Sequence, residues 1–175
     1  FPKFTEVVRF LKDRDIHISV VTNGSGNDKI LEVADLFGPK DWVRLSLDSG
    51  SDDTFQAMHK PRKPISLDQI CEGIPPIKEK NPDLRIGFSF IITWKGAEAN
   101  DSLIVENIHE IVSGAERARQ YKFDYISFKP FLVRAPENNA ELMGVTDEWK
   151  EYDSIVSRIR EAVNEAKTLE TDSFK

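Results

Sequence analysis

The sequence predicts an α/β fold in which about four parallel strands alternate with flanking helices. Short apolar runs rich in β-branched residues alternate along the chain with segments of helical periodicity. The runs are apolar at consecutive positions, as in strands that are buried on both faces of a parallel sheet. Each run ends in polar residues, glycine or proline, and the sites of α/β proteins lie at such strand ends. Periodicity alone is consistent with an open doubly wound sheet and with an arc of a (β/α) barrel.

Length and composition indicate one folded domain with a core of its own. The chain has 175 residues, of which 39% are hydrophobic and 31% are charged, a composition unlike that of disordered segments. With 24 Lys and Arg residues against 30 Asp and Glu residues, the net charge of -6 makes nucleic acid an unfavourable default partner. No apolar run is long enough to span a bilayer, so we expect a cytoplasmic protein without a membrane partner.

The first part of the chain contains two of the expected strands. A helix is predicted over residues 2–14, with an inward stripe formed by Phe4, Val7, Val8 and Leu11. A strand follows over 16–22 and stops at the turn-forming residues 23–26. A short helix around 30–36 and a second strand over 43–48 repeat the pattern.

Prolines punctuate the helices that come next. After a short helix around 54–59, the basic run His59-Lys60-Pro61-Arg62-Lys63 forms a loop that ends before Ser66, a predicted helix N-cap. The following helix begins at Leu67. The Pro75-Pro76 pair should kink or break it, because proline lacks a backbone donor and clashes with the preceding turn.

The second half supplies two further strands and two longer helices. The strands are predicted over 86–93 and 125–131. The helix between them carries an apolar stripe made of Ile104, Ile108, Ile111, Val112, Ala115 and Ala118. An irregular stretch then reaches Gly144, and an amphipathic helix over 147–168 closes the chain. We assign residues 1–135 to the α/β core and residues 136–175 to an irregular segment and a C-terminal helix that packs on the same domain.

Polar side chains at the strand ends form the candidate site. Parallel strands deliver their carboxyl ends to one rim, so the side chains at these ends should converge there. Each predicted strand also contains a serine, which has poor strand propensity, and this repetition indicates a polar face with room for a ligand. Alternation along three strands places the serine and the polar rim residue on the same face. The candidate ligand-binding residues are Thr22, Asn23, Ser46, Asp48, Ser89, Thr93, Lys129 and Phe131.

Other interpretations of these residues remain open. The strand-end residues serve equally as turn formers and helix caps, and the serines can bond neighbouring backbone groups. The basic run at 59–63 can meet an anionic substrate or form a solvated loop. In an unrelated barrel or doubly wound enzyme, Asp48 and Lys129 would form an acid/base pair. His17 and His109 lack partners at metal-ligand spacing, so no metal site is predicted.

Three motifs follow one another within residues 1–135. Val-Val-Thr-Asn-Gly at 20–24 ends one strand, Arg-Leu-Ser-Leu-Asp-Ser-Gly-Ser at 44–51 ends the next, and Thr-Phe-Gln-Ala-Met-His-Lys-Pro at 54–61 comes after it. Their order and spacing resemble the middle of a radical SAM enzyme core. The resemblance implies a partial parallel (β/α) barrel with S-adenosylmethionine and a [4Fe-4S] cluster as cofactors. In this family the cluster reduces the sulfonium, and the resulting 5′-deoxyadenosyl radical abstracts hydrogen from the substrate.

The resemblance also implies contacts with S-adenosylmethionine, position by position. Thr22-Asn23 match the Thr-Asn-Gly strand end near the ligand. Ser46 and Asp48 match the strand end that contacts the aminocarboxypropyl and ribose groups. The strand over 88–93 matches the strand beside adenine, and the segment 129–132 matches one that packs near adenine. A zwitterionic, ribosylated cation needs a carboxylate, hydroxyl groups and a flat apolar wall, which these residue types provide.

The sequence departs from the family at two points. It lacks the Cys-x3-Cys-x2-Cys loop and the Gly-Gly-Glu-Pro strand end, both of which would precede Phe1 in family order. Its single cysteine, Cys71, is interpreted as a buried small hydrophobe and cannot replace the three thiolates that a cluster requires. We therefore expect an inactive fragment of a radical SAM parent enzyme whose missing N-terminal segment holds the cluster and whose substrate is unknown. The alternative is a non-catalytic α/β module that binds a ligand or a protein.

The expected truncation also predicts self-association. Without two preceding strands, the strand over 16–22 would have an unpaired edge and would expose apolar surface. Such an edge can pair with another chain, so we expect contacts between copies of this chain there.

Overall fold

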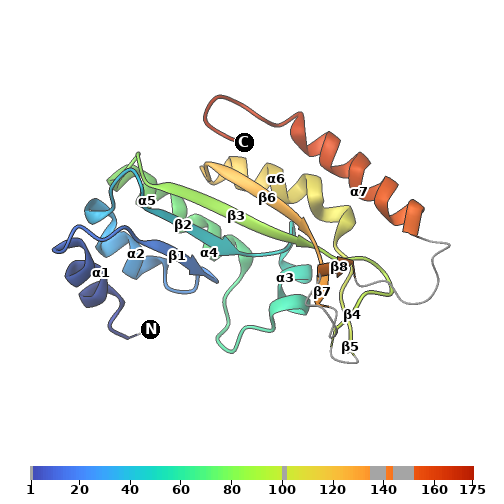
Figure 1. Ribbon diagram of the computed structural model, residues 1–175, viewed down its shortest axis with the longest axis horizontal. Helices are drawn as coiled ribbons and strands as arrows, with labels where there is room; N and C mark the ends of the chain where they lie inside the picture. The colour runs from blue at the N-terminus through green and yellow to red at the C-terminus, as the bar shows by residue number, and fades with distance from the viewer. Residues whose placement is uncertain (1, 100–101, 135–140, 144–151) are drawn as a thin grey trace.

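A four-stranded parallel sheet lies at the centre of the protein. The computed structural model describes residues 2–99, 102–134, 141–143 and 152–175. The strands follow the order β1-β2-β3-β6 across the sheet (Figure 1) and span Ser19–Thr22 (β1), Trp42–Ser46 (β2), Arg85–Ile92 (β3) and Tyr125–Pro130 (β6). All four were predicted, although β1 begins later than expected and leaves Ile16 43% exposed.

Helices connect and flank the strands. They span Phe4–Lys12 (α1), Asn27–Glu32 (α2), Asp52–His59 (α3), Leu67–Glu72 (α4), Ile74–Lys80 (α5), Ile111–Gln120 (α6) and Tyr152–Lys167 (α7), with short 3-10 helices at Ala34–Leu36 (η1) and Ile108–Glu110 (η2). Two small antiparallel ladders pair Glu98–Ala99 (β4) with Ser102–Leu103 (β5) and Leu132–Arg134 (β7) with Glu141–Met143 (β8). In Figure 1, α3 and both ladders lie toward the carboxyl ends of the strands, and α7 runs beside α6.

The two faces of the sheet differ in what covers them. One face contributes an apolar layer to the core beneath the helices, formed by Val43, Leu45, Ile86, Phe88 and Phe90. Helix α6 approaches this layer so closely that a Cβ added at Gly114 would lie 3.0 Å from the Phe90 ring. On the opposite face, Val21 is 57% exposed and Ile91 is 38% exposed. The α/β prediction is therefore confirmed, whereas the expected burial of both faces is wrong for the described part of the chain.

The proline pair interrupts a helix, as predicted. Helix α4 ends at Glu72 and α5 begins at Ile74, so Pro75 and Pro76 occupy the first turn of a new helix. Backbone N–H groups in a first turn have no partner within the helix, and proline is therefore tolerated there. The predicted cap at Ser66 is also confirmed, because it forms a capping box with Gln69 at the start of α4.

Two helical predictions and one irregular stretch are corrected by the structure. The helix expected from Ile104 begins only after Asn107, whose side chain bonds other segments instead of capping a longer helix. Val7 on α1 is 40% exposed, because this helix packs against α2 and η1 through a narrow face. The stretch predicted to be irregular contains the β7–β8 ladder. Residues 147–151, the predicted start of the last helix, lie outside the described residues.

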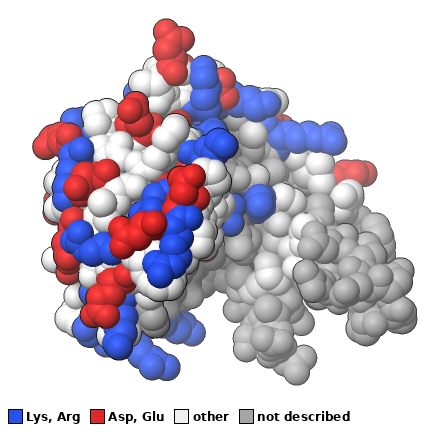
Figure 2. All heavy atoms as spheres, turned by 60° about the vertical axis from the view of Figure 1, so that its left-hand side comes forward, with Lys and Arg blue, Asp and Glu red and all other residues white. Residues whose placement is uncertain are grey.

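The surface at the amino ends of the strands carries interspersed charges. Figure 2 shows basic and acidic side chains alternating over this face, where Arg9 pairs with Glu32 and Lys80 pairs with Asp35. Among the helices that the structure describes, none has the length and apolar composition needed to cross a membrane. The division of the chain at residue 135 stays a prediction.

Candidate functional site

Three serines form one row across the open face of the sheet. Ser46 of β2 lies beside Ser89 of β3, and Ser89 lies beside Ser127 of β6. Partners in a parallel register share a face, so the three side chains project together. None of the three hydroxyls bonds another residue that the structure describes. This face therefore carries a row of hydroxyl groups without a described partner near the carboxyl edge of the sheet, which we call the serine row; Ser89 is 8% exposed, and Ser46 and Ser127 are half-buried.

Cation–aromatic pairs occupy the same face toward the amino ends of the strands. The Arg44 guanidinium lies 5.6 Å from the Trp42 ring centre, and the Arg85 guanidinium lies 4.8 Å from that of Tyr125. A Cβ added at Gly87 would lie 2.1 Å from the Tyr125 ring, so only glycine leaves room for this ring against the strand. The Tyr125 ring lies two residues before Ser127 along β6, and the Trp42 ring lies four residues before Ser46 along β2, on the same face as the serine row.

Asp48 lies at the carboxyl edge, and both oxygens of its carboxylate are engaged. Oδ1 accepts the Ile91 N–H at 2.7 Å, and Oδ2 lies 3.5 Å from His59 Nε2. A left-handed backbone conformation with φ 54° ends the strand alternation that predicted Asp48 on the face of Ser46. Burial raises the pKa of Asp48, and the Ile91 hydrogen bond and the His59 charge offset this only in part. This carboxyl group therefore takes up a proton more readily than an exposed aspartate.

Asn107 joins three segments at the same edge. Its side-chain Oδ1 accepts the Thr93 N–H at 2.7 Å, and its Nδ2 donates to the carbonyl oxygens of Asp48 at 2.7 Å and Ile91 at 2.8 Å. Asn107 is fully buried, so water cannot replace it as the hydrogen-bond partner of these backbone groups. One carboxamide therefore fixes the end of β3 relative to the loop that follows β2.

Glu110 fixes the start of α3 from a neighbouring position. Its carboxylate accepts the Gly50 N–H at 2.8 Å, the Ser51 N–H at 3.3 Å and the Thr54 hydroxyl at 2.8 Å, and it also bonds the Ser51 hydroxyl. Burial alone would raise the pKa of Glu110, but these hydrogen bonds outweigh it and hold the pKa below its usual value. The loop that carries Asp48 is thus anchored on both sides.

Thr22 and Asn23 do not join the serine row. Thr22 lies beside Leu45 on the helix-covered face, and its Oγ1 accepts the Gly24 N–H at 3.1 Å. Asn23 is exposed, and its Oδ1 accepts the Ser25 N–H at 3.1 Å and the Ser25 hydroxyl at 2.8 Å. Both side chains stabilise the turn after β1, as the turn-former interpretation expects.

The other candidate residues divide between structure and solvent. Thr93 is 2% exposed, and its hydroxyl bonds a backbone carbonyl of the loop before η2 at 2.5 Å. The Phe131 ring lies edge-on to the Trp94 ring, with 6.5 Å between the ring centres. Lys129 is exposed on the open face and forms no ion pair with a described residue. The described ion-pair partner of Asp48 is His59, so the acid/base pair of Asp48 with Lys129 does not form in this structure.

Sequence reasoning missed the three residues that organise the edge. His59 enters the sequence analysis as part of the basic run and of the motif at 54–61, with no contact predicted for it, and no prediction singles out Asn107 or Glu110. A helix-disfavouring asparagine within an apolar stripe was a usable signal for Asn107. The contact of Glu110 with Gly50 joins residues that lie 60 positions apart, and no local pattern encodes it.

The residues of this chain do not fit an iron–sulfur cluster. Cys71 is fully buried in α4, and burial raises the pKa of its thiol to about 12, so the thiolate that ligates iron is not populated. Among the residues that the structure describes, His, Cys, Asp and Glu side chains nowhere gather in a group of three suited to a metal ion. The serine row, by contrast, provides polar groups that an organic ligand can bond.

Comparison with known proteins adds evidence on the fold. Neither a protein-family model nor a curated protein matches the sequence. Among solved structures, a radical SAM methyltransferase from Sphaerobacter thermophilus is similar at a TM-score of 0.53 and 12% identity. The likeness covers 93% of this chain and 44% of that protein. This chain has a radical SAM-like fold. The likeness rests on four parallel strands with flanking helices, which were predicted. Because the sequence identity is only 12%, the likeness concerns the fold alone.

Proposed function

We propose that this chain forms the S-adenosylmethionine-binding part of a radical SAM enzyme. The serine row is the observation that carries the proposal, because it places three unbonded hydroxyls on the open face of a radical SAM-like sheet. Hydroxyls that project side by side suit the ribose of a nucleoside, and the neighbouring aromatic rings suit its flat base. The similar structure is that of an enzyme, which supports enzyme parentage at the level of the fold.

In this proposal the eight candidate residues have unequal roles. Ser46 and Ser89 bond the ligand directly, and Lys129 supplies charge at the rim. Asp48 offers at most one oxygen, because its other oxygen holds the Ile91 N–H. Thr22, Asn23, Thr93 and Phe131 support the loops around the site.

The proposal assigns binding, and no redox step, to the residues of this chain. In radical SAM enzymes, S-adenosylmethionine and an iron–sulfur cluster together provide the chemistry that abstracts hydrogen from a substrate. The three thiolates for that cluster are not among these residues, which include one cysteine. The chain by itself is therefore expected to bind the nucleoside without cleaving it.

Titration with S-adenosylhomocysteine, followed through backbone amide NMR shifts, tests the proposal because it detects millimolar binding. The largest shifts are expected at Ser46, Ser89 and Ser127. Substitution Ser89→Ala removes one hydroxyl and should weaken binding about three- to tenfold. Ser19→Ala is the matched control, since Ser19 is exposed at the opposite end of β1.

Two results would contradict the proposal. One is the absence of saturable shifts at millimolar ligand, and the other is equal weakening by Ser89→Ala and Ser19→Ala. Shifts confined to residues away from the serine row would instead favour the second candidate, a non-catalytic α/β binding module. The single cysteine of this sequence, which cannot supply the three thiolates of a cluster, is the observation that favours this module.

A further inference from the structure

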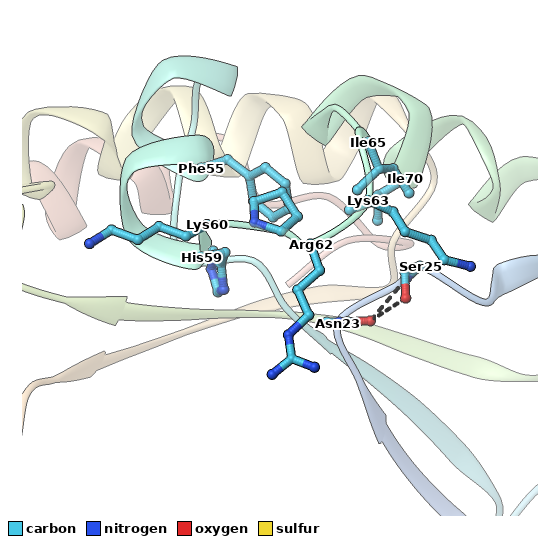
Figure 3. A pocket seen from close by; sticks show the side chains of 10 residues that line it. Asn23, Ser25, Phe55, His59, Lys60, Arg62, Lys63, Ile65 and Ile70 are labelled. Carbon is cyan, nitrogen blue, oxygen red and sulfur yellow. Dashed lines mark hydrogen bonds between the residues drawn. The ribbon is translucent and has the colours of Figure 1, made fainter.

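A cavity lies beside α3 and α4, next to the turn that follows β1. It encloses about 390 Å³. Its apolar wall consists of Phe55, Ile65 and Ile70. Figure 3 shows that the opposite side is formed by the basic loop that follows α3, with side chains of His59, Lys60, Arg62 and Lys63 around the cavity. One side of the cavity is thus apolar and the other side is cationic.

The basic loop is anchored at both of its ends. At its start, the Lys60 N–H donates to the Gln56 carbonyl oxygen of α3 at 3.1 Å. At its end, Gln56 donates from Nε2 to the carbonyl oxygen of Ile65 at 2.8 Å, and Asp52 accepts the Leu67 N–H at 2.7 Å. Pro61 and another proline at position 64 restrict the backbone between these anchors. The loop therefore holds its cations in place with less conformational freedom than an ordinary solvated loop would have.

The charges of this loop lack partners within the described chain. Lys60, Arg62 and Lys63 form no ion pair with any residue that the structure describes, although the chain has a net charge of -6. In Figure 3 the Arg62 side chain extends from the loop toward the strand ends, and the Lys60 and Lys63 side chains extend to either side of it. Three like charges within four positions repel one another, and an anion would relieve this repulsion.

We propose that this cavity binds a small organic anion that has an apolar body and a carboxylate or phosphate head. The apolar body would pack mainly on the half-buried Ile65, with the small accessible parts of Phe55 (2% exposed) and Ile70 (1% exposed) behind it. The head would meet Arg62, whose planar guanidinium bonds carboxylate and phosphate groups with two parallel N–H groups. Asn23 and Ser25 line the cavity at the turn after β1 and add polar groups beside the head.

This site is distinct from the serine row and does not depend on it. No serine of the serine row lines the cavity, although Asn23, which supports a loop of the nucleoside site, does. The two sites approach each other at His59, whose Nε2 lies 2.9 Å from the Leu47 carbonyl oxygen and 3.5 Å from the Asp48 carboxylate. An anion can therefore bind the cavity whether or not a nucleoside binds the open face. The position suits a substrate or effector held next to a cofactor.

Titration of the whole chain with three probes of similar size tests the proposal. Phenyl phosphate and benzoate carry the two candidate heads, and benzyl alcohol has the same ring without charge. Backbone amide NMR shifts should saturate at residues 55–65 with one or both anions, and added salt should weaken this binding because the site is exposed to ions. Binding of phenyl phosphate alone or of benzoate alone would identify the head, and either result supports the proposal.

Two variants separate the basic loop from general charge effects. Arg62→Gln should weaken anion binding about tenfold, the effect of losing a charge-assisted pair. Lys167→Gln makes the same charge change on an exposed part of α7 and should leave binding unchanged. Both positions are exposed, so both variants should fold, which circular dichroism can verify.

Three outcomes would overturn the proposal. These are the absence of saturable shifts with either anion, equal affinity for benzyl alcohol, and equal weakening by Arg62→Gln and Lys167→Gln. None of them bears on the nucleoside site, because that site is measured with S-adenosylhomocysteine at different residues.

Discussion

Single buried polar side chains determine the geometry at the carboxyl edge. Asn107 makes three hydrogen bonds to backbone groups of two strand ends, and Asp48 makes one more between them. Because the site is buried, the stability of this edge depends strongly on these bonds: a backbone group that loses its partner here cannot form a hydrogen bond with water instead. The position of each candidate ligand contact at this edge thus depends on side chains that do not contact the ligand.

Replacing Asn107 with alanine tests this dependence. Asn107→Ala leaves one backbone donor and two acceptors unpaired, so we expect the free energy of unfolding to fall by about 3 kcal/mol. Urea denaturation of the variant and the wild type measures the difference. Asn164→Ala on the exposed side of α7 is the control and should change stability by less than about 0.5 kcal/mol. A small effect of Asn107→Ala would show that the edge is held by other contacts.

At the scale of elements, a buried carboxylate connects α1 to the sheet. Asp41 accepts the Ile18 N–H before β1 at 2.6 Å, the Gly38 N–H at 2.6 Å and the Lys12 ammonium of α1 at 2.6 Å. Burial alone would raise the pKa of Asp41, but these hydrogen bonds outweigh it and hold the pKa below its ordinary value. The helix, the loop and the strand therefore depend on one ionised group.

The stability of this connection should depend on pH. Because the pKa of Asp41 is lower in the folded than in the unfolded chain, its contribution is complete above the unfolded value of about 4 and is lost as pH falls through the folded pKa. Asp41→Asn should cost about 2 kcal/mol at pH 7, and the difference from wild type should narrow below pH of about 4. Urea denaturation over pH 3 to 7 measures this, with the exposed Asp83→Asn as control. A difference that is constant over this range would be inconsistent with an ionised Asp41.

Asp48 should show the opposite sign. Its pKa is raised by burial, so the folded chain binds this proton more readily than the unfolded chain does. The ionised side chain therefore costs stability above the folded pKa, and this cost disappears as pH falls toward the unfolded value. Two aspartates at opposite ends of the sheet thus respond to acid in opposite directions.

For the whole molecule, we propose that the outer edge of β1, which pairs with no other strand among the described residues, favours association. Strand β1 lies at one end of the sheet order, and Val21 on it is 57% exposed. At the other end, the Lys175 backbone bonds Ile126 of β6 and Asp124 just before it, and so covers the beginning of that edge. An exposed strand edge can pair with the same edge of a second copy about a two-fold axis.

We expect the chain to dimerise through β1. Val21→Lys places a charge on the exposed side of the edge strand and should shift the chain to monomers, whereas Val105→Lys in the loop before η2 should not. Light scattering over a range of concentrations measures the molar mass of each. A wild-type chain that stays monomeric at every concentration would contradict this prediction.

Local patterns predicted much of the fold because the features they report are local. Strand residues of β3, the capping residue Ser66 and the break at Pro75 follow from side-chain type and from the missing proline donor. The serine row was also predictable in part, since the period of two places each serine on a definite face of its strand. Which face is open could not be predicted, because consecutive apolar residues are compatible with burial on either side.

Residue types and their spacing suffice for the order of elements, the parallel α/β class and the polar character of the strand ends. The tertiary structure decided which of those polar groups remain free: the carboxylate of Asp48 is engaged by Ile91, 43 positions away, while the hydroxyls of the serine row have no described partner. The physical reason is that a buried hydrogen bond forms wherever folding brings a donor to an acceptor, and only the folded chain specifies which distant groups meet.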